Sequence, residues 1–185
     1  MSARRRIVAW PLLAAAVALL GGCGRTHPLS ATVPGVYEEL GHVRYQVEIS
    51  RELNPRDSED VSYLKGLTPA QARLRPDQSF FAVWILVENR SQQTQTPTSD
   101  FRIIDTQHNT YRPIVPTASN EFAYRSYALP GKGQIPDPEG PAYNSPTEGA
   151  MVLFKVSQAS YDNRPLTFAI TDHATGQTAT TDLDV

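Results

Sequence analysis

The side chains that most often carry chemistry are few in this sequence and stand far apart. Its 185 residues include one cysteine, Cys23, and four histidines, His27, His42, His108 and His173. A zinc or copper site needs three or four converging ligands, and no two of these histidines have the short spacing that places ligands side by side. We therefore expect no metal and no cofactor.

Two acidic features admit both a chemical and an ordinary interpretation. Asp57, Glu59 and Asp60 could together attract calcium, but the cluster lacks the glycine turn of a calcium-binding loop, so a solvated loop is preferred. Asp172-His173 could belong to a catalytic triad, yet the sequence contains no G-x-S-x-G nucleophile elbow. We expect the protein not to be an enzyme.

Aromatic residues gather in and around one proline-rich stretch. Tyrosines on a stiff loop lose little conformational entropy on contact, which suits a recognition surface. The alternative is that the same side chains fold back and pack the loop onto a sheet. The candidate recognition residues are Phe122, Tyr124, Tyr127 and Tyr143.

The amino-terminal segment has the order of an export signal. Arg4-Arg5-Arg6 is followed by fourteen mostly apolar residues, 7–20, and then by Gly21-Gly22-Cys23. Crossing a bilayer takes about 20 apolar residues, so this run is short for a transmembrane helix. The pattern predicts a signal peptide over residues 1–22.

The end of this segment, Leu20-Gly21-Gly22-Cys23, resembles the lipobox of bacterial lipoproteins. The resemblance implies that Cys23 is acylated with palmitate-type chains and becomes the first mature residue. It also implies that the protein is lipid-anchored on the outer face of the cell membrane or in the periplasm, since more than one acyl chain gives stable anchoring. The alternative is a secreted soluble protein in which Cys23 has no role.

Charge and cysteine usage exclude two classes of protein. Removing the leader leaves 14 basic against 19 acidic residues, with no basic stripe after Arg6, so nucleic acid is not an expected partner. Acylation of the one cysteine leaves no thiol, so the fold cannot depend on disulfides. The remaining 163 residues are enough for one domain with its own core.

The mature chain begins with a polar stretch and then shows strand patterns. Residues 23–35 are predicted to be the lipidated cysteine and a flexible tether, and residues 36–185 the folded domain. Strict alternation over residues 42–50 predicts a strand with Val43, Tyr45, Val47 and Ile49 on the buried face.

The run 80–87 is apolar on both parities, which predicts a central strand buried on both faces, with Trp84 among its most important residues. Thr68-Pro69-Ala70-Gln71 predicts one short helix with a capping box. Further strands are predicted over 101–104, 111–115 at a sheet edge, 149–156, 166–172 and 178–185, with irregular segments over 51–78, 89–99 and 130–146.

Short strands joined by turn-rich segments predict an all-β antiparallel β-sandwich. The pattern resembles the DUF4352 type of immunoglobulin-like domain found in bacterial lipoproteins. The residues that carry the resemblance are 81–91, 99–105, Tyr111, 149–156 and 163–166. It implies an immunoglobulin-like sandwich with long loop insertions and one short helix.

From these features we expect a membrane-anchored, non-enzymatic binding or envelope-support module that contacts an envelope protein or wall polymer. The alternative is a carrier that holds a small hydrophobic ligand in a cavity between the sheets. An apolar cavity of several hundred Å³ would favour the carrier.

Overall fold

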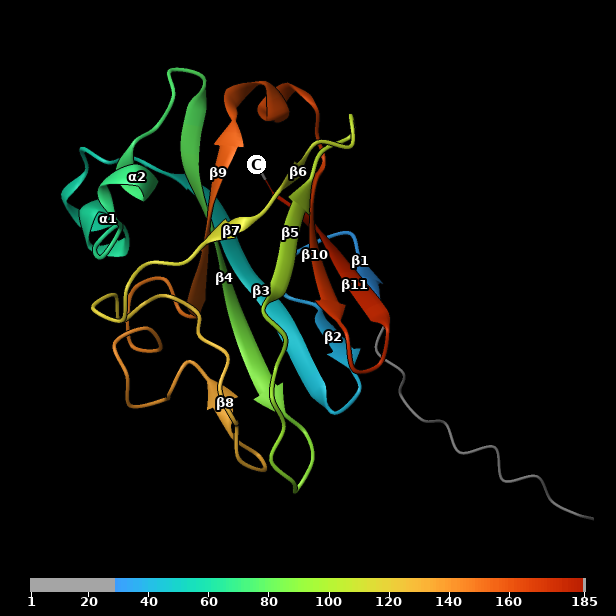
Figure 1. The fold of residues 1–185 in the computed structure, drawn as a ribbon. Coiled ribbons are helices and arrows are strands. Elements are labelled where there is room, and N and C mark those ends of the chain that lie inside the picture. Colours follow the sequence, from blue (N-terminus) through green and yellow to red (C-terminus); the bar gives the residue numbers. More distant parts are fainter. Residues whose placement is uncertain (1–28, 185) are drawn as a thin grey trace, which may run out of the picture.

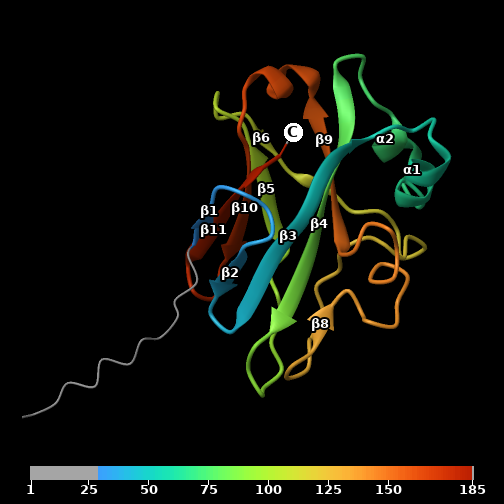
Figure 2. The same ribbon diagram turned by 180° about the vertical axis from the view of Figure 1, so that it is seen from behind.

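The computed structural model describes residues 29–184. Two β-sheets face each other, and two short helices lie beside one of them (Figures 1 and 2). The first sheet has the strand order β1 (Ser30–Ala31), β11 (Gln177–Leu183), β10 (Leu166–Asp172), β5 (Asp100–Ile104) and β6 (Thr110–Tyr111). The second has the order β2 (Tyr37–Leu40), β3 (Val43–Leu53), β4 (Gln78–Asn89), β9 (Ala150–Ser157) and β7 (Pro113–Ile114), with β8 (Gln134–Ile135) paired to β4. The predicted all-β sandwich is confirmed.

The space between the sheets is filled by aromatic and branched side chains. Phe168 of β10 stacks on Phe101 of β5, with ring centres 5.5 Å apart, and meets the edge of Phe154 of β9 at 6.2 Å. All three rings are at most 2% exposed. Buried rings of this size dominate the energetics of a core, so this cluster holds the two sheets together.

Strand β4 is central, as predicted, because it pairs with β3 on one side and β9 on the other. One face of β4 packs into the space between the sheets. The other face carries Phe80, Ala82 and Trp84, all at most 2% exposed. They are buried because residues of the helical segment and of a loop, such as Tyr63 and Phe122, cover this face. This cover explains why the strand is apolar on both parities.

Residues 29–184 contain two α-helices where one was predicted. The predicted one is α2 (Pro69–Ala72), with the capping box between Thr68 and Gln71 formed. The other is α1 (Ser58–Tyr63), whose first turn is capped by the Asp57 carboxylate. Outside the predicted helix, residues 51–78 were expected to be irregular. Helix α1 was missed because its six residues are too few to show a periodic apolar face. A 3-10 helix, η1 (Gln158–Asp162), follows β9.

The predicted buried face of β3 is correct only as far as Val47. The register with β4 shifts between Val47 and Ile49, which is the effect of a β-bulge. After the shift, Ile49 is 43% exposed and Ser50 is buried. The prediction that Ile49 faces the core was therefore wrong, because one inserted residue exchanges the two faces of a strand.

The segment expected to be a tether becomes part of the first sheet before its end. Residues Ser30 and Ala31 of β1 pair in parallel with Thr180 and Thr181 of β11, the one parallel pairing among the strand pairs described. Two residues give no periodicity to read, so the sequence carried no signal for this strand. The signal peptide over 1–22 and Cys23 lie outside the described residues. Within residues 29–184, no helix has the length and apolar character needed to cross a membrane.

Candidate functional site

A cleft opens at one edge of the sandwich, between β5 of the first sheet and β7 and β9 of the second. Its volume is about 370 Å³, within the range of small-molecule sites, which begins at about 300 Å³. The walls are mostly apolar. The lining residues are Ser99, Phe101, Pro113, Ile114, Val115, Pro116, Ala123, Tyr124, Arg125, Ser126, Met151, Val152 and Leu153.

The cleft exists because the chain passes from one sheet to the other beside it. Tyr111 of β6 pairs with β5 in the first sheet, whereas Pro113 of β7 pairs with β9 in the second, so the crossover lies at Arg112. Figure 1 shows the chain passing from β6 to β7. Proline cannot donate to a further strand, and β7 is accordingly the last strand of its sheet. The edge placement predicted for residues 111–115 is confirmed, but the single strand predicted there was wrong, because Tyr111 and Pro113 belong to different sheets.

The opposite wall is a segment of the aromatic stretch that runs along β9. The Tyr124 amide donates to the Met151 carbonyl (2.8 Å), and the Met151 amide donates to the Phe122 carbonyl (2.7 Å). Phe122 also packs edge-on against Tyr63 of α1, with ring centres 4.9 Å apart. These contacts fix the segment on the sheet, so the wall is held in place by backbone as well as side chains.

Tyr124 is a structural part of this wall. The side chain is 7% exposed, its ring meets the edge of Phe101 at 5.0 Å, and its hydroxyl donates to the Thr98 carbonyl (2.7 Å). Burial raises the pKa of the hydroxyl above its usual range, and the nearby Tyr45 adds to the rise. Tyr124 thus stays neutral.

Among the described residues that line the cleft, Arg125 has the only charged side chain. Its Nη2 donates to the carbonyls of Pro116 (3.1 Å) and Thr117 (2.6 Å) on the opposite wall. Within residues 29–184, no carboxylate forms an ion pair with it. The guanidinium is therefore held in position with its charge uncompensated by a direct partner.

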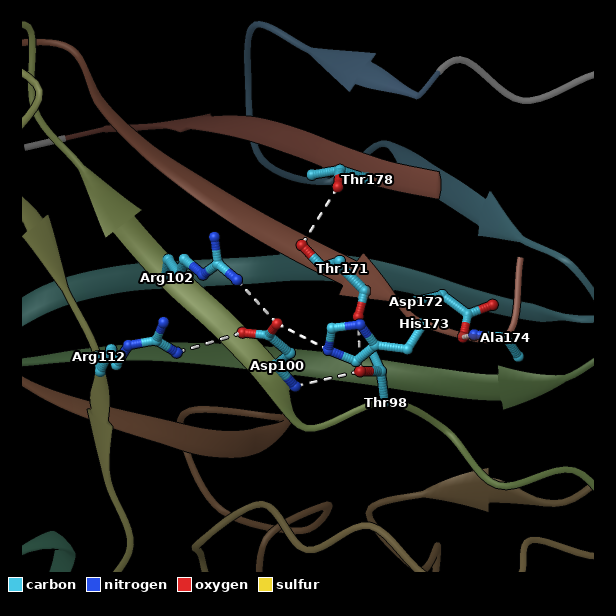
Figure 3. Close-up of polar contacts among 9 residues, drawn as sticks. All are labelled: Thr98, Asp100, Arg102, Arg112, Thr171, Asp172, His173, Ala174 and Thr178. Atoms are coloured by element: carbon cyan, nitrogen blue, oxygen red, sulfur yellow. Dashed lines mark hydrogen bonds and ion pairs between the residues drawn. The ribbon is translucent and has the colours of Figure 1, made fainter. Parts of the chain in front are cut away.

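A group of charges lies on the outer face of the first sheet, around Asp100 (Figure 3). Arg102 Nη2 lies 2.9 Å and His173 Nε2 3.0 Å from Asp100 Oδ2, while Arg112 Nη1 lies 3.7 Å from Oδ1. Burial opposes ionisation of Asp100, but the hydrogen bond from Arg102 and the charges of Arg102 and His173 outweigh it and hold its pKa below the usual range. Asp100 is therefore a carboxylate shared by three basic groups.

Asp172 and His173, which the sequence suggested as members of a catalytic triad, make separate contacts. His173 contacts Asp100, whereas Asp172 accepts hydrogen bonds from the Ala174 amide (3.0 Å) and the Thr175 hydroxyl (2.8 Å) and so closes the β10–β11 turn. The Thr98 hydroxyl, drawn beside this group in Figure 3, donates to the Thr171 carbonyl at 2.7 Å. It is thus committed to a structural bond.

The other predicted site residues lie apart from one another. His42, His108 and His173 occupy three different turns, and among the described residues no three His, Cys, Asp or Glu side chains gather in a way that could hold a metal. In the acidic cluster, Asp57 caps α1 and Asp60 pairs with Arg51 at 2.7 Å.

Of the four candidate recognition residues, the structure places two against the body of the protein and leaves one clearly exposed. Tyr124 is buried and Phe122 is half-buried, which is the packing alternative for those two positions. Tyr127 is 46% exposed and follows directly after the cleft wall. Tyr143 is half-buried and lies in the separate turn after Gly140.

Sequence reasoning missed Arg125, Asp100 and the apolar lining from β7 and β9. Arg125 lies inside the aromatic stretch that drew attention, so an unpaired cation between aromatic residues was an available signal. The approach of β5 to β9, by contrast, depends on how the two sheets pack, and no local pattern carries it.

Comparison with known proteins connects the chain to solved structures through its fold. No family model and no curated protein matches the sequence, so the DUF4352 resemblance is not confirmed. A functionally unknown protein from Listeria monocytogenes superposes with a TM-score of 0.53 at 7% identity, over 84% of each chain. At such identity the likeness shows the fold alone.

Two Bacillus subtilis structures are less similar in shape. The yjhA protein has a TM-score of 0.47 at 10% identity, covering 83% of this chain and 99% of its own. A candidate lipoprotein, ycdA, has a TM-score of 0.47 at 11% identity, covering 80% of this chain and 38% of its own. No function is carried over from either.

Proposed function

We propose that this chain is a lipid-anchored, extracytoplasmic binding module that catalyses no reaction, and that the cleft between β5 and β9 is its binding site. The observation that carries the proposal is the cleft itself. Clefts of this kind, mostly apolar with a few placed polar groups, are the usual form of a ligand site. The anchor rests on the leader and on Cys23, and the DUF4352-like assignment is retained here only as a proposal.

The non-enzymatic half of the proposal rests on what surrounds the reactive groups. A general base acts only on a proton within hydrogen-bond reach. The His173 imidazole faces the Asp100 carboxylate, and the Thr98 hydroxyl beside it donates to a backbone carbonyl. The Arg125 guanidinium and the Tyr124 hydroxyl likewise donate hydrogen bonds to backbone carbonyls. These groups are arranged to hold structure.

The proposal is tested by filling the cleft in the full-length chain. Ala123 lines the cleft, whereas Ala128 is exposed on the same segment outside the lining. Ala123→Trp and Ala128→Trp therefore form a matched pair. After crosslinking in membranes, we expect the envelope molecules captured by the native chain to be lost with Ala123→Trp and retained with Ala128→Trp, both variants melting cooperatively.

Equal capture by both variants would show that binding lies elsewhere, for example at Tyr127 and Tyr143, which a double change to alanine examines. A product formed from envelope extract by the native chain, and not by the His173→Ala variant, would overturn the non-enzymatic half of the proposal.

The carrier remains a second candidate because the cleft has a suitable volume, about 370 Å³. It lies at the edge of the sandwich, whereas the space between the sheets is filled by Phe101, Phe154 and Phe168. A carrier must also release its ligand. Transfer of a fluorescent fatty acid between vesicles, accelerated by the native chain and not by Ala123→Trp, distinguishes a carrier from a simple binding module.

A further inference from the structure

We propose that the cleft binds an amphiphile with an anionic headgroup, which Arg125 recognises while the apolar walls take the hydrocarbon part. This inference rests on the proposed function and names the ligand class of the same site.

The single charge of the cleft is placed where it can select an anion. Arg125 is the only ionised side chain in a lining made otherwise of apolar and hydroxyl-bearing residues. The mature sequence has more acidic than basic residues, 19 against 14, so a lone cation in the cleft is contrary to the overall charge. An apolar site that contains one uncompensated cation is complementary to one anion joined to an apolar body.

The guanidinium of Arg125 also has hydrogen-bond donors that no protein acceptor uses within residues 29–184. Arginine has five N–H donors, and the Pro116 and Thr117 carbonyls accept from Nη2 alone. No partner within residues 29–184 accepts from its Nε or Nη1. Three N–H groups on a fixed guanidinium are thus available to a phosphate or carboxylate, which forms charge-assisted bonds with them.

The remaining polar groups of the lining add little for a polar ligand. The Tyr124 hydroxyl donates to Thr98 and the Ser126 hydroxyl donates to the Pro97 carbonyl (2.5 Å). The apolar part of the lining includes Phe101, Met151 and Leu153, all at most 2% exposed as residues. A sugar or a charged peptide would find few partners there, whereas a hydrocarbon chain would be buried against carbon.

Other charges near the cleft do not alter this assignment. Glu121 and Asp137 line an adjoining hollow that Arg125 also borders, but neither is within ion-pair distance of it. The Asp100 group points to the outer face of the first sheet, away from the cleft, and already contains its own carboxylate (Figure 3).

Met151 makes the test direct, because it is the only methionine besides Met1. The full-length chain, labelled with carbon-13 at methionine methyl groups and reconstituted in phosphatidylcholine nanodiscs, is titrated at mildly alkaline pH. The four probes are dodecanoate, a dodecanoyl lysophosphatidic acid, dodecanol and dodecyltrimethylammonium, each titrated over the same range of mole fractions in the bilayer. The Met151→Leu variant assigns the signal.

We expect both anionic probes to shift the Met151 signal saturably, at about tenfold lower mole fraction than dodecanol, the ratio given by ~1.4 kcal/mol. A preference between carboxylate and phosphate identifies which source of anion is favoured. Arg125→Gln should abolish the preference for anions and Arg125→Lys should keep most of it. Arg112→Gln, a change to an arginine outside the lining, should leave it unchanged.

Equal response to dodecanoate and dodecanol would overturn the anionic assignment while leaving the cleft as a binding site. Tighter binding of the cationic probe would overturn it as well. If no probe moves the Met151 signal, both this inference and the cleft as an amphiphile site are wrong, although capture lost with Ala123→Trp would still support the proposed binding module. The comparison of the four probes on the native chain tests the anion preference even if an Arg125 variant does not fold.

Discussion

At the scale of single residues, two buried carboxyl groups respond to pH in opposite directions. Glu38 of β2 is 1% exposed, and its Oε2 accepts from the Thr181 hydroxyl (2.9 Å). Burial raises the pKa of Glu38 to about 7, against the smaller lowering effects of hydrogen bonds from the Thr181 side chain and from the backbone of Ala31 and Thr180. Neutral Glu38 therefore stabilises the fold at low pH, and this contribution is lost as the pH rises from about 4.3, the pKa of an unfolded glutamate, through about 7.

The Glu38→Gln variant should remove this dependence, because the amide is neutral at every pH. Above pH 7 we expect the variant to be more stable than the native chain by roughly 3 kcal/mol, since each pKa unit corresponds to about 1.4 kcal/mol. Below about pH 4 the two should be nearly equal. Thermal unfolding across this range measures the difference, and parallel curves for the two proteins would contradict the assignment.

Asp105 behaves in the opposite way. Burial opposes its ionisation, but hydrogen bonds from the Asn109 side chain and amide, the Ser160 hydroxyl and the Gln107 amide outweigh it and lower the pKa. The stability that ionised Asp105 contributes to the fold is fully present above about pH 3.9, the pKa of an unfolded aspartate. This stability is lost as the pH falls through the lower pKa of Asp105 in the folded protein.

Asp105→Ala should cost about 3 kcal/mol, because it removes the acceptor of four hydrogen bonds, one of them from the buried Ser160 hydroxyl. Asp172→Ala is the control, since Asp172 also closes a turn but faces solvent more. It should cost less than about 1 kcal/mol. Urea unfolding of both variants checks the pair, and equal losses would mean that the Asp105 network does not stabilise the β5–β6 turn.

At the scale of elements, the helical segment is a cover for the outer face of β4. Tyr63 of α1 meets Trp84 edge-on at 5.2 Å, and the Asn120 side chain donates to the Tyr63 carbonyl (2.8 Å). Trp84→Ala should cost about 3–5 kcal/mol. Trp84→Phe should cost much less, because a ring remains and the unpartnered Nε1 is removed.

Denaturant unfolding measures both Trp84 variants, and a small loss for Trp84→Ala would show that the cover is loose. If the helical segment is a fixed wall for Phe122, Trp84→Ala should also weaken ligand binding at the cleft.

The sequence was sufficient for features with a local signal. The apolar run of β4, the capping box of α2 and the edge proline of β7 all followed from the identity and spacing of neighbouring residues, and the structure confirms each. The face of Ile49 was wrong because a bulge depends on pairing with another strand. Strand β1 was missed because its reason to form is the edge of β11, about 150 residues away.

The candidate site was predictable only in part for the same reason. The aromatic stretch was recognised, and three of its residues line or flank the cleft. The cleft forms because β5 and β9 lie close together in different sheets and because the chain crosses between those sheets at Arg112. Both features depend on tertiary packing. Tyr124 follows the packing alternative, because Phe101 and Thr98 offer its ring and hydroxyl a buried site.

At the scale of the whole molecule, the proposed anchor and the sheet are close in sequence. Ser30 of β1 lies seven positions after Cys23, and at no more than about 3.6 Å per residue this stretch can span roughly 25 Å. A lipid on Cys23 would therefore keep the sandwich near the membrane, where amphiphiles are concentrated.

Acylation of Cys23 is tested most directly by comparing the native chain with Cys23→Ser in the same cells. We expect the native protein to lack residues 1–22, to carry acyl chains on Cys23 by mass spectrometry and to sediment with membranes. We expect Cys23→Ser to be recovered without acyl chains and largely outside the membrane fraction. Retention of residues 1–22 on the native protein, or equal sedimentation of the two forms, would contradict it.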